Sequence, residues 1–95
     1  MKLRWLSQAL AELDRVYEYI SQENPKAAKF VFTRIREESR KLRRFPHSGR
    51  VGQVAGTREL IVAGLPYLVV YRISSDTVEV MLVLHTAMDR PPLGH

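Results

Sequence analysis

The chain contains no cysteine and only three histidines among its 95 residues. Without cysteine there is no disulfide, no thiolate nucleophile and no sulfur ligand for a metal. The three histidines, His47, His85 and His95, are scattered and do not have the spacing of a zinc site. We therefore expect neither a structural metal nor a cofactor.

Long apolar runs are also missing. The longest, residues 65–70 and 80–84, are far shorter than the roughly 20 residues that a membrane-spanning helix needs. Residues 1–12 mix basic, apolar and polar side chains and lack the apolar segment and cleavage site of a secretory signal. We expect a cytoplasmic protein with one domain over residues 1–95. Residues 86–95 should be a tail, because Pro91 and Pro92 cannot extend a sheet.

No catalytic motif of high specificity is present. The sequence lacks a glycine-rich phosphate loop with its lysine, a Gly-x-Ser-x-Gly turn and a His-Glu-x-x-His helix. Any chemistry must therefore come from residues that only the fold brings together.

Apolar residues recur at helical spacing in the first half of the chain. A short strand is expected over residues 1–6, and Ser7 should cap the helix that follows. Asn24 should cap a second helix over residues 25–44, with Pro25 at its first position. The predicted core stripes of the two helices are Leu10, Leu13, Val16, Tyr17 and Ile20, and Ala28, Val31, Ile35 and Leu42.

The second half of the chain is typical of strands. Residues 58–63, 67–73 and 78–85 are rich in β-branched and aromatic residues and are separated by turn-forming segments. Residues 45–52 should form a loop. We predict an α+β fold, a helical hairpin packed on a mainly antiparallel four-stranded sheet in the order β-α-α-β-β-β, with the place of the first strand left open.

Strict alternation divides the last strand into two faces. Val78, Val80, Leu82 and Leu84 should face the helices, and Glu79, Met81, Val83 and His85 should face outward. With Leu68, Val70 and Arg72 beside it, the outward face would be too apolar to stay bare, so a partner should cover it.

Positive charge is concentrated in the middle of the chain. The net charge is +5, and residues 25–58 hold ten of the fifteen lysines and arginines but only two of the ten acidic residues. Such a field attracts polyanions or an acidic protein. Arg36, Arg40 and Arg43 should form a basic ridge on the second helix, away from its apolar stripe. The alternative is a solvated face that is basic only for solubility.

A second set of basic residues lies on the predicted strands and loops. It consists of Arg50, Arg58, Arg72, His85 and Arg90, with Glu59 and Tyr71 as further candidates for proton transfer. Cleavage of RNA through its 2′-hydroxyl needs a proton acceptor, cations around the phosphate and an acid for the leaving oxygen, and these residue types permit it. The alternatives are a hydrogen-bonded structural role for His85 and core packing for Tyr67 and Tyr71.

Several short motifs occur in a characteristic order. They are Trp5, Asn-Pro-Lys-Ala-Ala at 24–28, Pro46 with Gly-Arg-Val-Gly at 49–52, Gly-Thr-Arg-Glu-Leu at 56–60, Pro-Tyr-Leu-Val-Val-Tyr-Arg at 66–72 and Val-Leu-His at 83–85. Together they cover nearly the whole chain, which resembles the RelE/ParE superfamily of type II toxins. The resemblance implies a small cytoplasmic toxin encoded beside an antitoxin, whose partly disordered carboxyl-terminal segment wraps the toxin and neutralises it.

The resemblance leaves more than one function open. RelE-like members cleave mRNA in the ribosomal A site, for which Arg58, Arg72 and His85 would be the catalytic residues. ParE-like members inhibit DNA gyrase. The strands here lack the lysine cluster typical of RelE, Met88 stands where a basic residue is common, and no tyrosine follows Tyr71.

The motifs at 24–28 and 56–60 are similar to the ParE side. We therefore expect a ParE-like gyrase inhibitor rather than an enzyme. The alternatives are a RelE-like ribosome-dependent endoribonuclease and a non-toxic co-repressor that binds a partner. The residues expected to bind the target or the antitoxin are Arg36, Arg40, Arg43, Arg50 and Arg90.

Overall fold

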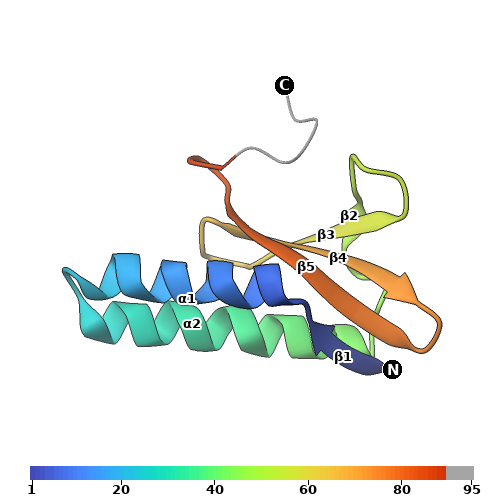
Figure 1. Cartoon of the computed structure of the whole chain (residues 1–95), viewed down its shortest axis with the longest axis horizontal. Helices are drawn as coiled ribbons and strands as arrows, with labels where there is room; N and C mark the ends of the chain where they lie inside the picture. The colour runs from blue at the N-terminus through green and yellow to red at the C-terminus, as the bar shows by residue number, and fades with distance from the viewer. Residues whose placement is uncertain (90–95) are drawn as a thin grey trace.

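The computed structural model describes residues 1–89, so of the predicted tail, residues 86–95, only 86–89 are described, and Arg90 lies outside the described residues. The elements are β1 (Lys2–Trp5), α1 (Ser7–Ser21), α2 (Pro25–Arg40), a 3-10 turn η1 (Lys41–Arg43), β2 (Arg50–Val51), β3 (Thr57–Ile61), β4 (Tyr67–Ser74) and β5 (Thr77–His85). The two helices lie side by side and cover one face of the sheet (Figure 1). This arrangement confirms the predicted α+β class. Over residues 1–89, neither helix is long and apolar enough to span a bilayer.

The sheet has five strands rather than the predicted four, in the order β1-β5-β4-β3-β2. The additional strand, β2, lies in the segment that was predicted as a loop and pairs Arg50 with Glu59 and Val51 with Arg58. A strand of two residues has no periodicity that a sequence could reveal. The first strand, whose place was open, pairs in parallel with β5, whereas the other pairs are antiparallel.

The start of α2 is as predicted. The Asn24 side chain accepts a hydrogen bond from the Ala27 N–H at 3.1 Å, and Pro25 occupies the first turn. The predicted cap of α1 is wrong, because Leu6 holds the capping position and Ser7 is already helical. The α-helix α2 ends at Arg40, and η1 continues the chain in a tighter winding.

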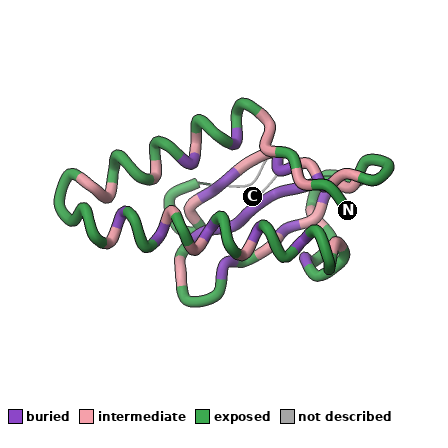
Figure 2. Tube along the Cα trace, turned by 90° about the horizontal axis from the view of Figure 1, so that it is seen from below, coloured by how far each residue is buried: buried purple, intermediate pink, exposed green. Residues whose placement is uncertain are grey.

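The core lies between the helices and the inner face of the sheet (Figure 2). The predicted α2 stripe is confirmed, since all four of its residues are buried. In α1, however, Leu10 and Tyr17 are 48% and 38% exposed, and Ala9 is buried in place of Leu10. Tyr17 instead meets the ring of Phe32 edge-on, with 5.7 Å between the centroids, where the two helices contact each other.

A β-bulge changes the faces of β5. Val70 pairs with Leu82 and Tyr71 pairs with Val80, so Met81 is an extra residue with no partner on β4. Beyond the bulge, Val83 joins the core cluster on the helix side. The predicted inward orientation of Leu82 and Leu84 is therefore wrong, although that of Val78 and Val80 is right.

The outer face of the sheet is apolar across its centre. Its side chains there include Leu68, Val70, Leu82 and Leu84, which pair across β4 and β5. Under the loop between β2 and β3, a hollow of about 220 Å³ is lined largely by apolar groups, among them Val54, Val70 and Met81. Leu68, Val70 and Leu84 are nevertheless only 4%, 6% and 9% exposed, so the face is not bare as expected, and that a partner covers it stays a prediction.

Candidate partner-binding and catalytic residues

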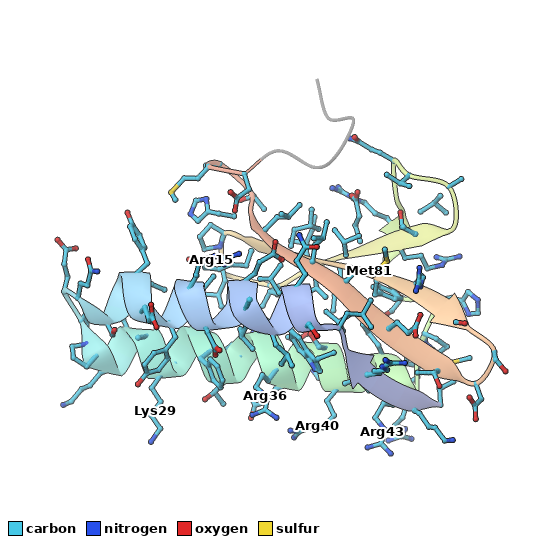
Figure 3. The ribbon with its side chains drawn as sticks, in the orientation of Figure 1. Arg15, Lys29, Arg36, Arg40, Arg43 and Met81 are labelled. Carbon is cyan, nitrogen blue, oxygen red and sulfur yellow. The ribbon has the colours of Figure 1, made fainter. Side chains whose placement is uncertain are left out.

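The predicted basic ridge lies beside an edge of the sheet. An open hollow of about 390 Å³ is lined by Lys2, Leu3 and Trp5 of β1 and by Arg36, Arg40 and Arg43 of α2 and η1. We call these six residues the basic groove. Its three arginines project side by side, away from the sheet (Figure 3).

The arginines of the groove have no acidic partner in the described part of the chain. Among residues 1–89, the ion pairs involve other cations. Arg36 lies over the ring of Phe32 at 5.7 Å, and the Arg43 Nε donates to the Met1 carbonyl at 3.3 Å. Three neighbouring cations without counter-charge give a local positive field that an anionic ligand would relieve.

The same groove contains an open strand edge. In the parallel pairing of β1 with β5, Lys2 N–H donates to Asp76 and Leu6 N–H donates to Val80, at 2.9 and 3.0 Å. Because alternate residues of such a strand direct their backbone groups to the same side, those of Leu3 and Trp5 point away from β5. No other strand of the described chain pairs with them. The groove therefore offers backbone hydrogen bonds next to positive charge.

The predicted catalytic arginines lie on opposite faces of the sheet. Arg58 is directly opposite Tyr71, and Arg72 is directly opposite the preceding residue, Thr57. The Arg58 guanidinium donates to the carbonyls of Gly49 and His47, at 2.8 and 3.3 Å. It therefore holds the loop before β2.

Arg72 is paired within the sheet. Its Nε donates to Oε1 of Glu79 at 2.6 Å, and Arg4 approaches the other oxygen of Glu79 at 3.7 Å. The guanidinium is half-exposed, but its charge is balanced by the carboxylate beside it.

His85 lies at the far end of β5. It pairs with Tyr67, whereas Arg72 pairs with Glu79, and five residues of a strand span about 17 Å. The His85 Nδ1 accepts the N–H groups of Ala87 and Met88, at 3.1 and 3.0 Å. The structure thus gives His85 the hydrogen-bonded role named above as the alternative, and it does not bring Arg58, Arg72 and His85 together.

The remaining candidates stabilise the loop between η1 and β3. Glu59 is only 5% exposed, and its Oε1 accepts from the Arg50 Nε at 2.9 Å. The Tyr71 hydroxyl donates to the Pro46 carbonyl at 2.7 Å and accepts from the Gly49 N–H at 3.0 Å. Burial raises the pKa of Tyr71, and the Gly49 N–H and Arg58 partly offset that rise. Tyr71 is therefore a buried hydrogen-bonding group, as the core-packing alternative predicted.

Sequence reasoning missed the β1 side of the basic groove. Leu3 and Trp5 are more than 30 residues from Arg36 along the chain, and no local pattern indicates that they meet. Residues 1–89 contain no group of three histidine, aspartate or glutamate side chains arranged to hold a metal.

Comparison with known proteins identifies the family to which this fold belongs. The structure matches a chain of a chromosomal ParDE toxin–antitoxin system from P. aeruginosa with a TM-score of 0.83 and 25% identity, covering 90% of this chain and 95% of that one. The fold is therefore that of the small proteins of toxin–antitoxin systems. A family model described as the ParE toxin of type II toxin-antitoxin systems matches residues 3–90. The chain belongs to this ParE toxin family, which confirms the resemblance to the RelE/ParE superfamily.

Two relatives are similar over most of their length. The protein Y4kP of Sinorhizobium fredii (strain NBRC 101917 / NGR234) is 41% identical over 90 residues, which are 95% of this chain and 93% of the relative. Toxin RelE2 of Caulobacter vibrioides (strain ATCC 19089 / CIP 103742 / CB 15) is 32% identical over 83 residues, or 87% and 92%. The protein is thus a toxin of a ParDE-type system, and the family implies an antitoxin as its partner.

Proposed function

We propose that this toxin acts in the cytoplasm by binding and inhibiting DNA gyrase, without catalysing a reaction of its own. The observation that supports this is the separation of Arg58, Arg72 and His85. Each of the three is engaged in a contact of the fold, and Arg58 and Arg72 lie on opposite faces of the sheet. General acid–base cleavage needs its groups within hydrogen-bonding reach of one substrate.

The test for gyrase inhibition is a supercoiling assay with purified gyrase and the isolated toxin. We expect supercoiling to fall and a cleaved gyrase–DNA complex to accumulate as toxin is added. Toxin mixed with its antitoxin beforehand is the control and should leave gyrase active. Unchanged supercoiling and no trapped complex at excess toxin would end the proposal.

The alternative is the ribosome-dependent endoribonuclease. The variants His85→Ala and Arg72→Ala distinguish the two, provided that circular dichroism shows both to be folded. Gyrase inhibition predicts that they still arrest growth and that mRNA stays intact. Loss of toxicity together with cleaved mRNA in the wild type would favour the nuclease. No growth defect from the wild-type toxin expressed alone would favour the co-repressor.

We further propose that an acidic, extended segment of the antitoxin occupies the basic groove. Such a segment can add as a strand to the free edge of β1, with backbone hydrogen bonds to Leu3 and Trp5. Its carboxylates would then lie against the unpaired arginines of the groove. The backbone contacts supply affinity, and the charges mainly raise the association rate.

Charge reversal tests this placement. Replacing Arg36, Arg40 and Arg43 by glutamate should slow association with the antitoxin at least about tenfold at low salt, and should reduce its salt dependence. The matched control makes the same change in net charge at Lys26, Lys29 and Arg44. Equal losses for both triple variants would show a general charge effect, and an unchanged rate for the groove variant would rule out this position.

A further inference from the structure

A second hollow, of about 430 Å³, lies between α1 and the carboxyl end of β5. Helix α1 lines it with Glu12, Glu18 and Tyr19, β4 and β5 with Tyr67 and His85, and the following turn with Asp89. We call these six residues the acidic pocket. The basic groove shares none of them, because it lies along β1, which pairs only with the first half of β5.

The charge of the pocket is opposite to that of the protein. Three carboxylates and one guanidinium, that of Arg15, line it, although the whole chain carries +5. Glu12 accepts the Val83 N–H at 2.7 Å, and Asp89 accepts the His85 N–H at 2.8 Å. These backbone donors orient the carboxylates of Glu12 and Asp89. None of the three carboxylates forms an ion pair within residues 1–89.

Tyr67 contributes a second, independent feature. The residue is only 5% exposed, and its ring meets the ring of His85 edge-on, with 5.2 Å between the centroids. Its hydroxyl forms no hydrogen bond within residues 1–89, and because no buried side-chain oxygen or nitrogen of the described chain lacks a partner, this oxygen must reach the open side of the pocket that Tyr67 lines. Burial raises the pKa of Tyr67, and Tyr19 and Asp89 raise it further. The phenol therefore faces negative surroundings, and its oxygen can accept a hydrogen bond from a cationic ligand.

We propose that the acidic pocket receives a positively charged side chain, an arginine in preference to a lysine, from the protein partner of this toxin. A guanidinium presents five N–H donors in one plane, so it can reach carboxylates and the Tyr67 oxygen at the same time. Its methylene groups can pack on Val16 and Met88 at the pocket wall. Tyr19 and Tyr67 add aromatic groups that attract a cation. An anionic ligand would be repelled by the three carboxylates, which form no ion pair within residues 1–89.

Charge complementarity and the family together identify the antitoxin as the protein that supplies this side chain. A ParDE-type toxin implies an antitoxin, so the inference rests on that pairing and does not depend on gyrase as the target. With the basic groove at the other end of β5, the antitoxin segment needs acidic residues at one position and a basic anchor at another.

The first experiment uses arginine amide as the probe, titrated into the isolated ¹⁵N-labelled toxin and followed by NMR. We expect saturable shifts of the Tyr67, His85 and Asp89 amides, with a dissociation constant on the order of millimolar. Norleucine amide, which keeps the α-ammonium group and lacks the guanidinium, should cause no such shifts. No saturable shift with arginine amide up to about 100 mM would overturn the proposal.

Two variants and a control locate the binding. Tyr67→Phe removes only the hydroxyl, and Glu18→Gln removes a charge without changing shape. Each should weaken arginine amide binding about threefold to tenfold, in line with one hydrogen bond or one exposed charge. Glu23→Gln, in the exposed turn after α1 and outside the pocket, should leave it unchanged. If Glu23→Gln weakens binding as much as Glu18→Gln, the pocket is not the site.

The second experiment repeats the titration with the toxin–antitoxin complex. If the antitoxin fills the pocket, the same amides should no longer respond to arginine amide, and Glu18→Gln should speed dissociation of the complex. A full response in the complex would overturn the assignment to the partner. Neither titration contains gyrase, so failure of the gyrase assay leaves both results interpretable.

Discussion

Removing the Tyr71 hydroxyl should destabilise the toxin through a single buried connection. The side chain is fully buried, and its hydroxyl joins β4 to the loop between η1 and β2. Tyr71→Phe keeps the ring but leaves the Gly49 N–H and the Pro46 carbonyl without that partner. An unsatisfied buried group costs about 1–3 kcal/mol, so we expect the free energy of unfolding to fall by about 2–4 kcal/mol.

Urea unfolding followed by circular dichroism measures this change. Tyr19→Phe is the matched control, because that tyrosine is 63% exposed, and it should change the free energy of unfolding by less than about 0.5 kcal/mol. Gly49→Ala tests the same connection from the loop side, since its new Cβ would lie 2.6 Å from the Tyr71 hydroxyl and 2.9 Å from the Glu59 carbonyl. If Tyr71→Phe behaves like Tyr19→Phe, the hydroxyl does not hold the loop and the reasoning fails.

Three further predictions concern local contacts and titration. Asn24→Ala should lower the free energy of unfolding by about 1 kcal/mol, because it removes the acceptor of the Ala27 N–H, and Asn24→Asp should restore most of the loss in urea titrations. Glu12→Ala should speed hydrogen exchange at the Val83 amide, which loses its acceptor; unchanged exchange would contradict that contact. Because the pKa of Tyr67 is raised on folding, the unfolded chain loses this proton first as the pH increases. The stability that the neutral phenol provides is complete below pH about 10 and declines above it, so the free energy of unfolding should fall more steeply there in the wild type than in Tyr67→Phe. The same pH dependence of the free energy of unfolding in the wild type and in Tyr67→Phe would refute this.

Much of the helical hairpin could be predicted because its signals are local. Asn24 and Pro25 mark the start of α2 whatever lies elsewhere in the chain, and its apolar stripe follows from the helical repeat. The same helical repeat wrongly predicted that Leu10 and Tyr17 are buried, because an apolar residue at the margin of a stripe can face either the sheet or the solvent. The difference depends on how α1 is rotated on the sheet.

The candidate sites were less accessible to sequence reasoning. Arg36, Arg40 and Arg43 could be grouped because they recur at helical spacing in one continuous segment, but the strand edge beside them comes from residues 2–5. Arg58 and Arg72 have suitable chemistry for a nuclease, yet pairing places them on opposite faces of the sheet. Residue type predicts what a group is able to do, and only the register decides which groups meet. The acidic pocket had no sequence signal, since its residues come from α1, β4, β5 and the turn after β5.

The extra residue at Met81 determines what the last part of β5 presents to its neighbours. Without it, uninterrupted alternation would turn Leu82 and Leu84 toward the helices and carry the His85 ring to the opposite side, away from Tyr67. One inserted residue therefore lets a single strand support the hydrophobic core through Val80 and Val83 and build a polar recess at its end. A relative that lacks this insertion should keep the hairpin and lose the recess.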